Sequence, residues 1–79
     1  MLGRWPRGLV LSRRGRTVGI EVNANSAPTV TRGFWTAVAD LGLREVYVVA
    51  PVRESFPLGQ GVEAISLGGL LERLDGAAG

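Results

Sequence analysis

The chain has 79 residues, a hydrophobic fraction of 46% and a formal net charge of +2, values typical of one small folded domain rather than a disordered chain. It contains no cysteine, no histidine and no lysine. These absences exclude disulfides, thiolate zinc sites, a histidine general base and Schiff-base chemistry.

The positions of the arginines and the lengths of the apolar runs bear on where the protein is located and what it contacts. All nine basic residues are arginines, and five of them lie in the first sixteen residues, where no acid occurs. Apolar runs fall far short of the roughly 20 residues that span a bilayer, and the N-terminus lacks the apolar core of a signal peptide. We therefore expect a cytoplasmic protein with no membrane contact, no cofactor and no metal.

Two β-rich runs open the chain. We expect strands near Leu9–Ser12 and Thr17–Val22, because aliphatic and β-branched residues flank a short polar connection with a central glycine. This pattern is typical of a β-hairpin.

A helix is predicted next, after the turn-forming segment NANSAP. Apolar side chains recur at helical spacing over residues 30–41 and form one stripe. Thr29 or Ser26 is suited to cap its start, and Gly42 is suited to end it. Gly33 costs about 1 kcal/mol against alanine inside a helix, so a close backbone approach is expected there.

The run Val46–Val49 predicts a central strand with both faces buried, next to a parallel neighbour. A strand, a helix and a strand in that order imply a right-handed crossover. A loop then leads to a last strand at Val62–Leu67 and a short tail helix at Leu70–Leu74. The prediction is an α+β fold of order ββαββα, with a small mixed sheet of about four strands and one main helix on one face.

This architecture leaves apolar surface uncovered, because one helix and a short tail cannot cover both faces of such a sheet. We expect a homodimer, formed through the sheet face opposite the helix or through an edge strand. Trp5 and Trp35 are candidate interface residues, and packing of Trp35 on the hairpin edge is the alternative. The single domain spans residues 1–79, in which residues 1–7 and 75–79 are expected to fray.

Three stretches carry a resemblance to a known family: GIEVNANSAPTVTRGFWTAVADLG, VYVVAP and FPLGQGVEAISLGGLLERL. They are similar to the C-terminal domain of a large group of prokaryotic AAA-type ATPases, a domain of uncharacterised role with a restriction-endonuclease-like, PD-(D/E)xK fold. The resemblance covers Leu9 to Leu74 and implies half of such a core. The family's ATPase module has no counterpart in this sequence, which lacks a GxxxxGK[ST] motif, so the chain resembles a truncated or free-standing relative.

The family's nuclease-like site implies an Asp and a Glu that bind Mg²⁺ and a Lys that activates water. Glu21 matches the Glu, Asn23 stands in place of the Lys, and the Asp position falls near Arg7. These groups sum to zero charge rather than −1, so we interpret the site as degenerate and the chain as not an enzyme. We expect Glu21 to stay in water or to pair with Arg7, and Asn23, Asn25 and Ser26 to satisfy backbone groups of the turn.

Two functions stay open at this point. The first is a non-catalytic interaction domain that forms a homodimer, or that docks on an ATPase or another protein. The second is a nucleic-acid-binding remnant in which Arg13, Arg14 and Arg16 of the hairpin are candidate phosphate-binding residues. A solvated turn is the alternative interpretation of this arginine cluster.

Overall fold

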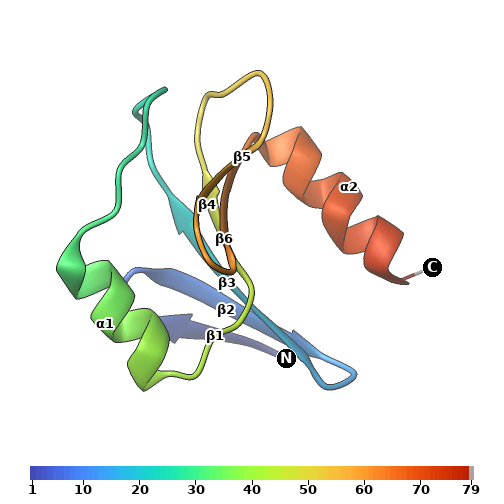
Figure 1. Ribbon diagram of the computed structural model, residues 1–79. Helices are drawn as coiled ribbons and strands as arrows, with labels where there is room; N and C mark the ends of the chain where they lie inside the picture. Colours follow the sequence, from blue (N-terminus) through green and yellow to red (C-terminus); the bar gives the residue numbers. More distant parts are fainter. Residues whose placement is uncertain (79) are drawn as a thin grey trace.

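The computed structural model describes residues 1–78, which form one sheet with a helix on each side (Figure 1). The elements, in chain order, are β1 (Leu2–Trp5), β2 (Gly8–Arg13), β3 (Arg16–Val22), α1 (Arg32–Asp40), β4 (Val46–Val49), β5 (Phe56–Gly59), β6 (Val62–Ile65) and α2 (Leu67–Ala78). Figure 1 shows α1 and α2 on opposite sides of the strands.

The order of the strands in the sheet is β1-β2-β3-β4-β6-β5. β4 pairs in parallel with β3 on one side and with β6 on the other, whereas the remaining neighbours are antiparallel. The predicted α+β fold with a mixed sheet is therefore confirmed. The predicted number of about four strands is wrong, because the sheet has six.

The two additional strands lie at the edges of the sheet. Residues 1–7, for which the sequence predicts fraying, contain β1, which pairs along its length with β2 and buries Trp5. β5 lies in the segment predicted to be a loop and pairs with β6. Pro57 is tolerated in β5 because an edge strand can lack one backbone N–H donor.

Helix α1 begins two residues later than the apolar spacing predicts. Its N-cap is Thr31 rather than Thr29 or Ser26, since the Thr31 Oγ1 accepts a hydrogen bond from the Phe34 N–H at 3.2 Å. Gly42 follows the helix with a φ of 64°, the left-handed conformation predicted for the residue that ends it.

Helix α2 is longer than the predicted tail helix of residues 70–74. β6 ends at Ile65, two residues earlier than predicted, because the Ser66 Oγ caps α2 by accepting a hydrogen bond from the N–H three residues later, at 3.1 Å. Residues 75–78, for which the sequence predicts fraying, continue the helix. Residue 79 lies outside the described residues.

The core has two parts, one on each face of the sheet. On the α1 side the buried residues are Trp5, Phe34, Val38, Leu43, Val46, Val48 and Val62. On the α2 side they are Val18, Tyr47, Ile65 and Leu70. The α2 side therefore holds the smaller part of the core. Neither helix of residues 1–78 has the length and apolar character needed to cross a bilayer.

Two glycines of the β1–β2 hairpin give a matched test of this packing. A Cβ at Gly8 would lie 2.1 Å from the Ile20 carbonyl oxygen, whereas a Cβ at Gly3 would have its nearest neighbour at 4.0 Å. We predict that Gly8→Ala lowers the free energy of unfolding by about 2 kcal/mol or more, because β2 must move away from β3. Gly3→Ala should change it by less than about 0.5 kcal/mol.

The measurement is urea unfolding of both variants at the same protein concentration. Equal losses of stability in the two variants would contradict the observed contact between β2 and β3.

Candidate functional site

Glu21 lies near the carboxyl end of β3, half-buried on the α1 side of the sheet. Its neighbour on β2 is Gly8, which lacks a side chain and lies against the backbone of Ile20 and Glu21. Within residues 1–78, no three acidic side chains gather closely enough to hold a metal ion. Glu21 therefore does not belong to a cluster of three acidic side chains in the described part of the chain.

Arg7 approaches this carboxylate without forming a contact ion pair. Its Nη2 donates a hydrogen bond to the Thr31 Oγ1 at 3.1 Å, and the ion pairs found among the described residues do not include Arg7 with Glu21. Of the two expected states of Glu21, in water or paired with Arg7, the ion pair with Arg7 is therefore not formed. Gly33 makes room for the guanidinium, since a Cβ there would lie 2.9 Å from the Arg7 Nη2. The group that approaches this glycine is a side chain, whereas the sequence predicts a close backbone approach.

The electrostatic environment of Glu21 favours its protonated form. Partial burial raises the pKa of its carboxyl above the ordinary value of 4.5, and the positive charge of Arg7 opposes this only in part. A metal ion or a second positive group in contact would have the opposite effect.

Asn23 and Asn25 form the turn that leaves β3. The Asn23 Oδ1 accepts a hydrogen bond from the Asn25 N–H at 2.9 Å, and the Asn25 Oδ1 accepts one from the Ala27 N–H at 2.9 Å. The predicted role of these amides in satisfying backbone groups is confirmed, and Ser26 lies exposed in the same bend. The Asn23 side chain is thus engaged locally, at the position where the resemblance implies a lysine.

The three hairpin arginines differ in the contacts they make. Arg13 and Arg14 lie exposed at the turn, where Arg14 has a φ of 53°. Arg16 instead forms a bidentate ion pair with Glu45. Its Nε donates a hydrogen bond to the Glu45 Oε1 at 2.8 Å, and its Nη2 donates one to the Glu45 Oε2 at 2.5 Å. The Tyr47 hydroxyl donates to the same Oε2 at 2.6 Å. One of the three candidate phosphate-binding residues is therefore held by a carboxylate.

This network has clear electrostatic consequences, which sequence reasoning missed. The hydrogen bonds from Arg16 hold the pKa of Glu45 below its ordinary value of 4.5, although burial opposes them. Burial, and then the hydrogen bond to Glu45, raise the pKa of Tyr47. The only signal in the sequence is the alternation that places Glu45 and Tyr47 on one side of β4.

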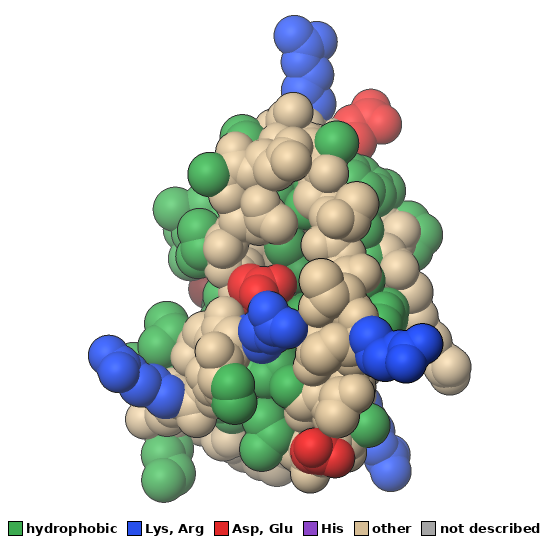
Figure 2. Space-filling model, turned by 90° about the vertical axis from the view of Figure 1, so that its left-hand side faces the viewer, with side chains coloured by type: hydrophobic (Ala, Val, Ile, Leu, Met, Phe, Trp, Pro, Cys, Tyr) green, Lys and Arg blue, Asp and Glu red, His purple; other side chains and the backbone are tan. Residues whose placement is uncertain are grey.

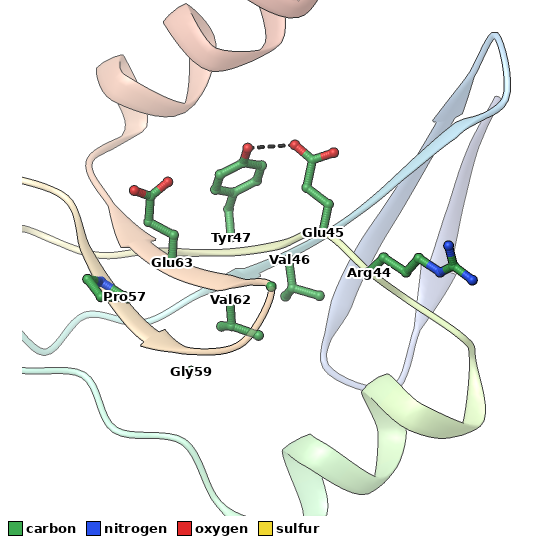
Figure 3. A pocket seen from close by; sticks show the side chains of 9 residues that line it. Arg44, Glu45, Val46, Tyr47, Pro57, Gly59, Val62 and Glu63 are labelled. Carbon is green, nitrogen blue, oxygen red and sulfur yellow. Dashed lines mark hydrogen bonds between the residues drawn. The ribbon is translucent and has the colours of Figure 1, made fainter.

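A shallow pocket of about 290 Å³ lies beside this network, at the turn between β5 and β6 (Figure 3). Its lining residues are Arg44, Glu45, Val46, Tyr47, Pro57, Gly59, Gly61, Val62 and Glu63. Figure 3 shows that these side chains do not converge: Val46 and Val62 point toward α1, whereas Glu45, Tyr47 and Glu63 lie on the side of α2. Glu63 is also paired, since the Arg73 Nη1 lies 2.5 Å from its Oε1.

A second pocket, of about 450 Å³, lies on the outer side of α1 and is lined by Pro6, Arg32, Gly33, Thr36, Ala37, Asp40 and Leu41. Figure 2 shows one side of the molecule, on which the basic side chains stand apart from one another and an acidic group adjoins one of them. No continuous basic patch forms on the face drawn there.

The α2 side of β1–β3 carries a surface that we call the open face. Cross-strand partners share a face of a sheet, so the pairing of Leu9 with Ile20, and of Leu2 with Leu11, places all four on the side of α2. The open face consists of Leu2, Arg4, Leu9, Leu11, Arg13, Ile20 and Val22. Leu2, Leu9 and Val22 are 66%, 43% and 78% exposed.

One side of α2 continues this surface. Leu70 and Leu74 pack on the sheet, and Arg73 reaches Glu63 of β6. Residues at i and i+4 share a helix stripe, so the opposite side of α2, toward β3, carries a second exposed set. We call this set the outer flank of α2. It consists of the stripe Leu67, Leu71 and Asp75 and of Glu72, which lies three residues before Asp75 on the solvent side of the helix. Leu67 and Leu71 are 60% and 55% exposed.

The tryptophans do not belong to this surface. Trp5 is 5% exposed, packs edge-on against Phe34 at 5.8 Å between ring centroids, and donates from its Nε1 to the Ile20 carbonyl at 3.4 Å. It is a core residue, so its prediction as an interface residue is wrong. Trp35 is half-buried and lies against Gly59 of β5, at the other end of the sheet from the β2–β3 hairpin on whose edge the alternative placed it.

We found no match to the chain among protein-family models, among curated proteins or among solved structures.

Glu21 and Glu45 should affect stability in opposite directions. Glu45, with its lowered pKa, contributes stability that is present above pH 4.5 and is lost as the pH falls through the lower value of the folded protein. Glu21, with its raised pKa, contributes stability that is present below pH 4.5 and is lost as the pH rises through the value of the folded protein.

We therefore predict that at pH 7 Glu45→Gln lowers the free energy of unfolding by about 1 kcal/mol, whereas Glu21→Gln raises it slightly. Both differences from the parent protein should shrink as the pH approaches 3. Denaturant unfolding between pH 3 and 8 measures them, and a stability loss for Glu21→Gln at pH 7 would show that its carboxylate forms a stabilising contact.

Proposed function

We propose that this protein is a non-catalytic interaction domain that associates with a second copy of itself. The observation that carries the proposal is the open face together with the two leucines on the outer flank of α2. Five large apolar side chains, Leu2, Leu9, Val22, Leu67 and Leu71, stand exposed on one side of the molecule. Contiguous exposed apolar surface of this kind is typical of protein interfaces.

The free energy gained by burying these apolar side chains favours association of two copies. Burying one leucine or valine side chain contributes about 1.5–3 kcal/mol, and a two-fold dimer buries the same set from both copies. Because the five side chains are only 43–78% exposed, this gain is comparable to the roughly 4–15 kcal/mol that association costs in lost freedom of motion. A small domain with a thin core gains proportionally more from such burial than a large one does.

The non-catalytic part of the proposal is supported by the surroundings of Glu21. A divalent cation requires several oxygen ligands, and Glu21 has Gly8 as its neighbour on β2 and the engaged amide of Asn23 after it. We propose that the chain is a degenerate relative of ATPase-linked nuclease-like domains, in the cytoplasm, with an ATPase or another protein as the alternative partner.

The nucleic-acid-binding alternative has less support. Arg16 is held by Glu45, which leaves Arg13 and Arg14 at the hairpin turn. Two exposed arginines without neighbouring aromatic side chains supply little affinity for a nucleic acid.

Sedimentation of the parent protein and of two leucine variants tests the proposal. The parent protein should change from monomer to dimer as its concentration rises from about 1 to 500 µM. Leu71→Glu should weaken dimerisation at least tenfold, because it places a carboxylate in the buried interface. Leu41→Glu is the matched control, since Leu41 is 50% exposed but follows α1 on the opposite side of the sheet, and it should dimerise like the parent.

Three outcomes would contradict the proposal: a parent protein that stays monomeric throughout this range, equal effects of the two variants, or binding of duplex DNA that falls steeply with salt and is abolished by Arg13→Ala with Arg14→Ala.

A further inference from the structure

We infer that the second copy docks reciprocally, with the outer flank of α2 of each copy lying on the open face of the other. This inference rests on the proposed self-association and specifies the two surfaces that meet. It makes the dimer a two-fold arrangement in which a helix and a sheet face are exchanged between the copies.

The two surfaces have the placement that such an exchange requires. Both lie on the α2 side of the sheet, and they adjoin each other, because α2 packs over β4 and β3 while the open face covers β3, β2 and β1. Figure 1 shows α2 and the tip of the β2–β3 hairpin on the right-hand side, away from α1. A two-fold axis between the surfaces brings each helix over the partner's uncovered strands.

The charges of the two surfaces are complementary. The open face carries Arg4 and Arg13 and no acidic residue, because the only acid of β1–β3, Glu21, lies on the α1 side. The outer flank of α2 carries Glu72 and Asp75 beside its two leucines, whereas its nearest arginine, Arg73, points to Glu63. A helix flank of leucines and acids thus matches a sheet face of aliphatic residues and arginines.

The areas also favour this arrangement over pairing of edge strands. A stable interface buries about 800 Å² on each partner, which is roughly one seventh of the 5374 Å² that the protein exposes. The free edge of β1 is four residues long. Met1 and Ser12 form a hydrogen-bonded pair, and such pairs alternate along an antiparallel ladder, so only Leu2 and Arg4 direct their backbone N–H and C=O groups away from β2. The other edge strand, β5, contains Pro57. Pairing of either edge strand would therefore bury little surface, whereas the open face extends over three strands.

Charge-reversal variants test the reciprocal geometry. The sheet variant carries Arg4→Glu with Arg13→Glu, and the helix variant carries Glu72→Arg with Asp75→Arg. Each alone places like charges across both halves of the dimer, so each should dimerise at least tenfold more weakly than the parent. Mixed together they should form a heterodimer with an affinity within about threefold of the parent, because opposite charges then face each other in both halves.

A control variant separates this pairing from general attraction between oppositely charged proteins. Arg32→Glu with Arg44→Glu gives the same net charge as the sheet variant but changes exposed residues that belong to neither surface. It should dimerise by itself like the parent, and mixing it with the helix variant should not restore the lost affinity. Circular dichroism checks that all three variants fold.

The outcomes are distinguishable. A parent dimer with charge variants that dimerise normally, or with weakened variants that mixing does not rescue, overturns the reciprocal geometry and leaves self-association in place. A parent protein that is monomeric at all concentrations overturns both proposals. Rescue that is equally strong with the control variant also overturns the geometry, because net charge alone would then explain it.

Discussion

The structure depends on one constraint: two helices must cover both faces of a six-stranded sheet. Six strands about 4.8 Å apart span roughly 24 Å, whereas a helix is only about 10 Å wide. On the α1 side, Trp5 and the half-buried Trp35 fill the space that α1 leaves. On the α2 side the helix packs over β3, β4 and β6, and nothing in the described residues covers Leu2, Leu9 and Val22. The proposed dimer follows from this asymmetry.

The central part of the fold could be predicted from the sequence, and its edges could not. The hairpin strands and the apolar stripe of α1 carry a local periodicity that matches the structure, and the uninterrupted apolar run Val46–Val49 matches a strand buried on both faces. The edge strands β1 and β5, with sequences LGRW and FPLG, have no alternation and contain glycine or proline. Their extended conformation comes from pairing with β2 and β6, which is a tertiary effect that local patterns do not record.

The candidate site residues divide in the same way: their local contacts could be predicted from the sequence, and their long-range contacts could not. Asn23 and Asn25 act on backbone groups two residues away, so their roles could be predicted from turn chemistry. The ion pair of Arg16 with Glu45 joins residues that are 29 positions apart in the sequence, and it forms because β3 pairs in parallel with β4. The proposed interface has the same limit. Which leucines stay exposed depends on the width of the sheet, which local patterns do not record, and Trp5 is part of the core although tryptophan is typical of interfaces.

The most direct measurement is an isotope-filtered NOE experiment on an equal mixture of methyl-labelled and unlabelled protein, which detects only contacts between copies. The reciprocal dimer should give cross-peaks from the methyl groups of Leu67 and Leu71 in one copy to Leu2, Leu9 or Val22 in the other. Three results would contradict the reciprocal dimer. The filtered cross-peaks could be confined to residues around β1, they could be confined to residues on the α1 side, or they could be absent at concentrations where the protein is dimeric.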